Sequence, residues 1–233
     1  MMKMVFFDES SLSETINHVL HAELFNEEIP MREKERIAVW IANRRGIKGS
    51  YQGLFAPTEA DFKGKATLFT GEPITSGAAT AHILGEEAMG LLQRWQLKIP
   101  DVQEALSSVK KNWREKIARD EERYGSPMGM FCCGKCTNAY WRGLLNGCLD
   151  KPETRLPRGL EILKSLRDGK GKWRRFPFYN TVWVLQDIQS SASKEELQYV
   201  APYLERTLAR KKIASSVYEQ RRQRILQKIV NLL

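Results

Sequence analysis

Apolar residues recur along this chain of 233 residues at intervals of three and four positions, which is the spacing of one face of an α-helix. No segment alternates apolar and polar residues with the period of two that indicates a β-strand. The pattern therefore predicts an all-α protein of about eight or nine helices. These are expected over residues 11–25, 31–45, 76–97, 101–124, 137–149, 157–167, 177–188 and 194–200, and from 202 to the end.

Capping residues and prolines mark the expected helix boundaries. A serine or aspartate followed three positions later by glutamate has the spacing of a capping box. Three such boxes are expected, at Ser11/Glu14, Asp101/Glu104 and Ser193/Glu196. Proline suits a first helical turn, so helix starts are also expected near Pro157, Pro177 and Pro202.

Residues 158–173, RGLEILKSLRDGKGKW, carry a recognisable spacing. The stretch resembles the repeat of terpenoid cyclases and protein prenyltransferases, and with its flanks the resemblance covers about residues 133–188. Ile162 stands where that repeat has an aromatic residue, and Arg167 where it has the glutamine that ties repeats together. The resemblance implies an α/α helical-repeat solenoid or partial toroid with a concave pocket. The matching positions are Arg158, Gly159, Leu163, Gly171 and Trp173.

The chemistry of that family is not implied, because neither its aspartate-rich acid motif nor its zinc-binding Asp, Cys and His pattern occurs here. A distant internal sequence repeat supports this architecture: six residues from Arg36 to Tyr51 align, at a constant offset of 122, with six from Arg158 to Trp173. We therefore expect one helical-repeat domain over residues 1–233, with candidate related halves 1–125 and 126–233.

Composition sets limits on location and partners. No run of 18 apolar residues occurs, so no transmembrane segment is expected and the protein is expected to be cytoplasmic. A net charge of +9 and a pI near 9.4 are compatible with an acidic partner. Three of the four cysteines lie within five residues, which does not suit a disulfide scaffold, so reduced thiols are expected.

The longest irregular stretch, residues 48–75, is too rich in apolar residues to be disordered. It is either the wall of a ligand pocket or a packed connector between repeat units. Within it, Thr58 and Asp61 are spaced to cap a short helical turn. The candidate ligand-binding residues, including two aromatic residues of the repeat, are Tyr51, Phe55, Glu59, Asp61, Glu72, Trp173 and Tyr179.

Two groups of residues are candidates for catalysis. His82 and Glu86 lie one helical turn apart, close enough to share a proton or a metal ion, or only to pack their helix. Cys133 and Cys136 form a C-x-x-C at a helix start, where backbone N–H groups favour a thiolate. Their alternative role is as small buried thiols.

The motif is similar to that of helical thiol peroxidases of the alkylhydroperoxidase type. Those proteins add a histidine a few residues later and an upstream glutamate, whereas here Thr137 to Tyr140 follow the second cysteine. Zinc at Cys133/Cys136 is the less favoured alternative, because Cys148 lies about 18 Å further along the predicted helix. No cofactor is expected.

The carboxyl-terminal segment is basic, with Arg210, Lys211, Lys212, Arg221, Arg222 and Arg224. These residues are candidates for binding nucleic acid or an acidic partner, or they form the exposed face of a docked helix.

Taken together, the sequence favours a scaffold that binds a small apolar ligand or a protein partner. The alternatives are an enzyme that uses His82/Glu86 or Cys133/Cys136, and a nucleic-acid binder.

Overall fold

The computed structural model describes residues 5–64, 66–210 and 214–231. These residues form ten helices and no extended strand, so the all-α prediction is confirmed. The helices are α1 (Leu12–Phe25), α2 (Met31–Ala42), α3 (Glu59–Lys63), α4 (Gly77–Trp95), α5 (Pro100–Tyr124), α6 (Gly134–Leu145), α7 (Pro152–Ser165), α8 (Phe178–Ile188), α9 (Ser191–Ala209) and α10 (Val217–Val230).

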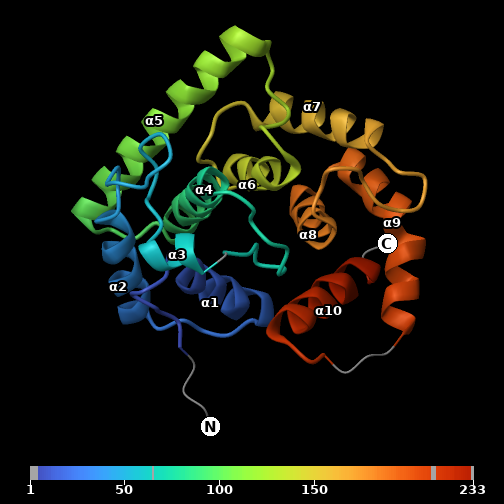
Figure 1. The fold of residues 1–233 in the computed structure, drawn as a ribbon, viewed down its shortest axis with the longest axis horizontal. Helices are drawn as coiled ribbons and strands as arrows, with labels where there is room; N and C mark the ends of the chain where they lie inside the picture. Colours follow the sequence, from blue (N-terminus) through green and yellow to red (C-terminus); the bar gives the residue numbers. More distant parts are fainter. Residues whose placement is uncertain (1–4, 65, 211–213, 232–233) are drawn as a thin grey trace.

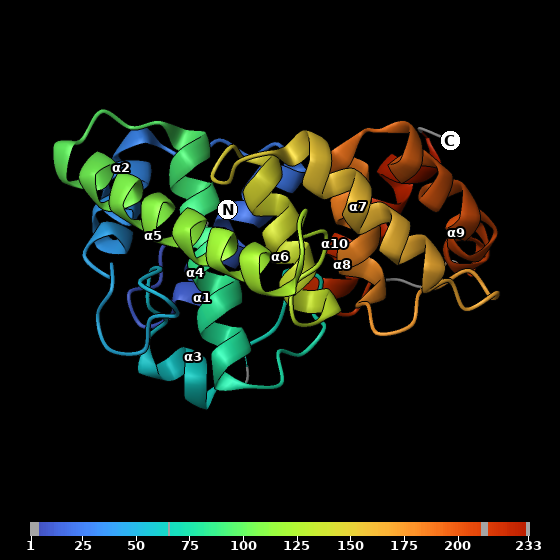
Figure 2. The same cartoon turned by 90° about the horizontal axis from the view of Figure 1, so that it is seen from above.

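Five of these helices form a ring in which each packs against the next: α1, α4, α6, α8 and α10 (Figure 1). Helices α2, α5, α7 and α9 lie outside this ring, and Figure 2 shows α5 and α7 crossing in front of the inner helices. From α4 onward the chain alternates between inner and outer helices. The apolar core lies between the two sets, with Trp113 of α5 and Trp141 of α6 fully buried.

Helices α4 and α6 run in the same direction. Glu87 pairs with Arg142 at 3.1 Å, and one turn further along each helix Gly90 lies against Asn146. A Cβ atom at Gly90 would come within 2.5 Å of the Asn146 amide, so glycine lets the helix ends approach. Helix α8 runs parallel to α6, since contacts join Asn138 to Asn180 near the helix starts and Arg142 to Asp187 near their ends.

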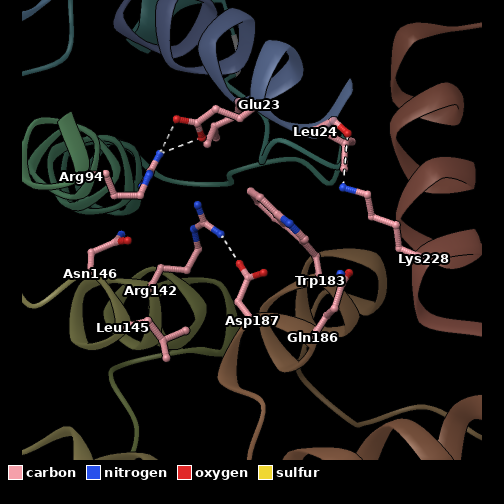
Figure 3. Close-up of a pocket in the computed structure, with 11 residues that line it drawn as sticks. Glu23, Leu24, Arg94, Arg142, Leu145, Asn146, Trp183, Gln186, Asp187 and Lys228 are labelled. Atoms are coloured by element: carbon pink, nitrogen blue, oxygen red, sulfur yellow. Dashed lines mark hydrogen bonds and ion pairs between the residues drawn. The ribbon is translucent and has the colours of Figure 1, made fainter. Parts of the chain in front are cut away.

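The carboxyl ends of the inner helices meet around a cavity of about 390 Å³ (Figure 3). Arg142 lies 3.9 Å from the centre of the Trp183 ring, and Arg94 pairs with Glu23 of α1 at 3.0 Å. Lys228 donates a hydrogen bond to the Leu24 carbonyl at the end of α1. Cations suit this place because helix carboxyl ends carry partial negative charge and unpaired carbonyls.

Several predicted helix boundaries are wrong. Helix α9 continues through Pro202, because burial of Val200 and Leu204 on either side outweighs the lost backbone hydrogen bond. Helix α7 starts at Pro152 rather than Pro157, and α5 starts at Pro100 without a side-chain cap. The cap of α9 is Ser190 with Ser193 instead of Ser193 with Glu196.

The long connector between α2 and α4 packs against the core. Phe55 and Leu54 are fully buried, and Thr58 and Asp61 form the expected capping box of α3. Asp61 reaches further, accepting hydrogen bonds from the backbone of Leu12 and Ser13 at the start of α1. The connector therefore fixes α1 to the rest of the ring.

Replacing Arg142 by methionine should destabilise the fold by about 3 kcal/mol or more, because it leaves the largely buried carboxylate of Glu87 without its partner and also removes the pair with Asp187, whose side chain is 40% exposed. The free energy of unfolding is measured by urea denaturation followed by circular dichroism. Arg158→Met is the matched control: its pair with Glu161 is more than half exposed, so the loss should stay below about 1 kcal/mol. Equal losses of unfolding free energy in the two variants would contradict the inference that Arg142 stabilises the packing of α6 against α4 and α8.

Candidate functional site

A cavity of about 380 Å³ lies where α4 and α6 begin, at the opposite ends of these helices from Arg94 and Arg142. We call it the thiol cavity. Its lining comes from the connector before α4, the first turns of both helices and the segment before α8. The residues are Tyr51, Thr75, Ser76, Ala78, Ala79, His82, Cys132, Cys133, Gly134, Lys135, Cys136 and Arg175.

The backbone at the start of α6 places the cysteines. Cys133 is the N-cap residue, with an extended φ of −156°, and no side chain caps the helix there. The first N–H groups of α6 are thus available to a sulfur anion. A Cβ atom on Gly134 would lie 2.4 Å from the Arg175 carbonyl, so glycine lets the segment before α8 close over this helix start.

Three thiols gather in the cavity. The sulfur atoms of Cys132, Cys133 and Cys136 all lie within 4.8 Å of one another. Cys132 and Cys133 are exposed, whereas Cys136 is buried. Hydrogen bonds from the Cys136 thiol and from the backbone N–H groups of Cys136 and Lys135 lower the pKa of Cys133 to about 5. The Cys133 thiolate in turn raises the pKa of Cys136, and burial adds to this effect.

A buried acid–base pair from α4 adjoins the thiols. His82 and Glu86 are each 1% exposed, and their Nε2 and Oε2 atoms are 3.0 Å apart, too poorly aligned for a directed hydrogen bond. Trp113 donates a hydrogen bond to the other carboxylate oxygen of Glu86 at 2.5 Å. Burial opposes a charge on His82, but Glu86 and the Cys132 thiol outweigh it and raise the pKa of His82 to about 9.

Burial also raises the pKa of Glu86, although His82 opposes this. Each charge therefore depends on the other. Aromatic rings enclose the pair: Tyr51 stacks on the His82 ring with centroids 5.0 Å apart, and Phe131 lies 4.4 Å from it. The enclosure strengthens the interaction, because little water is present to screen it.

The structure brings together residues that the sequence offered as separate alternatives. His82, Cys133, Cys136 and Tyr51 line one cavity, and Glu86 lies directly behind His82. Sequence reasoning missed three contributors: Cys132, Trp113 and Arg175. The sequence shows that Cys132 adjoins Cys133 and that Trp113 belongs to the apolar stripe of α5. Neither pattern shows that these residues lie next to α4.

The other candidate ligand residues lie apart from these groups. Glu72 caps α8 by accepting the Tyr179 N–H at 2.9 Å, much as Asp61 caps α1. Glu59 is exposed and pairs with Lys63, and Phe55 belongs to the core. Trp173 is buried beneath its loop and donates a hydrogen bond to Glu196 at 2.7 Å, while Tyr179 carries the Arg222 guanidinium over its ring.

The basic carboxyl-terminal residues are divided between α10 and the end of α9. Arg221 is buried and donates to the carbonyls of Phe69 and Asn17, and Arg222 donates to the Thr70 carbonyl. These contacts hold α10 against α1 and the connector before α4, and they engage both guanidinium groups. Arg210 is exposed at the end of α9, Arg224 is half-buried, and Lys211 and Lys212 lie outside the described residues.

A scan against protein-family models and searches of the curated proteins and of the solved structures found no match to this chain. Among the helices that the structure describes, none combines the length and apolar character needed to cross a bilayer. Functional inference therefore depends on the geometry of the thiol cavity.

Alkylation should separate the cysteines by position. In the folded, reduced protein at pH 7, iodoacetamide should modify Cys133 about 100-fold faster than Cys148, which is fully buried and whose pKa burial raises to about 12. The rate at Cys133 should rise as pH increases through about 5 and then level off, because the thiolate is fully formed above that pH. Peptide mass spectrometry measures both rates, with urea-denatured protein as the control. A Cys133 rate that still climbs through pH 8 would contradict this assignment.

Proposed function

We propose that the protein is a thiol–disulfide oxidoreductase whose reactive dithiol is Cys133/Cys136. The observation that carries the proposal is the convergence of this dithiol with His82 of a different helix in one cavity, with Glu86 paired to His82 behind it. Cys133 is exposed at the start of α6, as suits a thiolate that attacks a substrate disulfide. Cys136 is buried beside it, as suits the second thiol, which displaces the substrate from the mixed disulfide.

The reaction is a pair of exchanges. The Cys133 thiolate attacks one sulfur of a substrate disulfide, forms a mixed disulfide and releases the other substrate sulfur as a thiolate. Cys136 then loses its proton and attacks the Cys133 sulfur, which releases the second substrate thiolate. Two electrons pass from the protein to the substrate, and an external thiol reductant returns the Cys133–Cys136 disulfide to the dithiol.

The second exchange needs a base, because the pKa of Cys136 is raised and its thiol is buried. His82, with a pKa of about 9, is protonated at neutral pH, so the base is the Glu86 carboxylate behind it: the imidazolium can pass its proton to Glu86 and accept the proton of Cys136. The resemblance to helical thiol peroxidases, in which a histidine and a glutamate accompany a C-x-x-C, supports this role. Here both groups come from α4 and lie 47 to 54 positions before the dithiol in sequence.

The scaffold function favoured by the repeat resemblance has weaker support. An apolar ligand does not suit the cavity at the carboxyl ends of the inner helices, because Arg94, Arg142 and Asp187 line it. The thiol cavity, in contrast, combines small apolar residues such as Ala78 and Ala79 with reactive groups. We therefore place the function in the thiol cavity.

Oxidised glutathione tests the proposal. Reduced, metal-free wild type should lose two thiols with little adduct, whereas the double variant Cys132→Ala/Cys136→Ser should retain one glutathione on Cys133, because neither neighbouring thiol is left to resolve the mixed disulfide. Cys133→Ser should react at least about 10-fold more slowly. Intact-mass spectrometry with peptide mapping reads all three outcomes.

Two further variants separate chemistry from folding. His82→Gln should slow resolution of the mixed disulfide by about 10-fold or more while leaving the first attack nearly unchanged. Cys148→Ala should behave as wild type, because Cys148 lies outside the thiol cavity. No disulfide between Cys133 and Cys136, or equal reactivity of all four cysteines, would refute the oxidoreductase proposal.

A further inference from the structure

The arrangement of the thiol cavity points to a metal site. We infer that Cys132, Cys133, Cys136 and His82 bind one soft divalent cation, with Zn²⁺ as the expected ion. The site differs from the dithiol in needing two more ligands, Cys132 and His82. It also differs from a four-cysteine site, because Cys148 is buried elsewhere and its carbonyl is held by Arg114.

The sulfur positions are close to those that zinc requires. In a tetrahedral site with Zn–S bonds of about 2.3 Å, sulfur atoms lie about 3.8 Å apart. The three sulfur atoms already lie within 4.8 Å of one another. Side-chain rotations that move the sulfur atoms by about 1 Å or less therefore bring them to the spacing that zinc requires. Cys132 and Cys133 precede α6 and Cys136 lies in its first turn, so a loop and a helix supply the ligands together.

His82 supplies the fourth ligand. Its Nε2 atom faces Glu86 and its ring interacts with the Cys132 thiol, so Nδ1 is the nitrogen offered to the metal. The ring is not among the atoms that lie within 4.8 Å of one another, so the imidazole and the thiols must move closer together when the ion binds. A histidine held by a carboxylate on one nitrogen and by a metal on the other is a recurrent feature of zinc sites. Glu86 is itself fixed by the Trp113 indole, so the ring has a set orientation.

The ligand set and the charges around it favour zinc. Three thiolates and one imidazole select Zn²⁺ over Mg²⁺ or Ca²⁺, which prefer oxygen ligands. Such a complex carries a formal charge of about −1. Lys135 and Arg175 line the same cavity and have no ion-pair partner within the described part of the chain, and the amino end of α6 adds partial positive charge.

Metal binding would regulate the proposed redox reaction, and this part of the inference rests on the proposed function. Coordination to Zn²⁺ lowers the nucleophilicity of the thiolates, so the metal-loaded protein reacts with disulfides more slowly than the metal-free protein. Oxidation of Cys133 and Cys136 by a substrate disulfide moves two electrons to that substrate and releases Zn²⁺. The two states of the site therefore exclude each other.

Zinc binding is tested directly with the reduced full-length chain. Titration with Zn²⁺ alone, in competition with the chromophoric chelator 4-(2-pyridylazo)resorcinol, should give one ion per chain. Cys132→Ser, Cys133→Ser and Cys136→Ser should each weaken binding at least about 100-fold, His82→Gln about 10–100-fold and Glu86→Gln about 10-fold. Cys148→Ala should bind as wild type, and circular dichroism checks that every variant is folded.

Co²⁺ gives an independent readout of the ligands. Wild type should show the visible bands of tetrahedral cobalt with sulfur-to-metal charge transfer, and His82→Gln should retain the sulfur bands with altered visible ones. Binding that survives unchanged in Cys132→Ser or His82→Gln overturns the four-ligand site, as does the absence of stoichiometric binding. Disulfide formation in metal-free protein is scored separately, so a failed metal site leaves the redox proposal standing, and the reverse also holds.

Discussion

The parallel packing of α4 against α6 is the contact on which the rest of the structure depends. Because the two helices run in the same direction, their amino ends meet at one end of the ring and their carboxyl ends at the other. Glycines make this approach close: a Cβ atom on Gly90 would clash with Asn146. An antiparallel arrangement would carry His82 about 20 Å away from the cysteines, given the rise of an α-helix.

Helix polarity then explains why the two ends differ in chemistry. At the carboxyl ends, Lys228 donates to the Leu24 carbonyl, while Arg94 and Arg142 pair with carboxylates, and these contacts tie five helices together. At the amino ends, unpaired N–H groups favour sulfur anions, and the thiols are placed there. The cations at the carboxyl ends thus hold the helices of the ring together. The unpaired N–H groups at the amino ends remain available to stabilise thiolates that react or bind a cation.

Local sequence patterns predicted most of the helices, because periodicity and caps act over a few residues. They failed where tertiary packing decides, as at Pro202, which stays inside α9 between two buried residues. The candidate site shows the same division. The turn that pairs His82 with Glu86 and the C-x-x-C of α6 are both local patterns, but their meeting depends on which helices are neighbours. A histidine and a carboxylate, which the cysteine motif itself lacks, therefore come from a different helix.

The repeat stretch has its own physical account. Arg167, which replaces the expected glutamine, pairs with Glu196 of α9, and the Trp173 indole donates to the same carboxylate. At the offset of 122, Arg45 occupies the equivalent place and pairs with Glu104 of α5. Gly49 and Gly171, also 122 apart, both have positive φ, and so do Gly53 and Arg175. In both stretches, therefore, a loop arginine ties one outer helix to the next. In the later stretch, the same loop brings Arg175 to the thiol cavity.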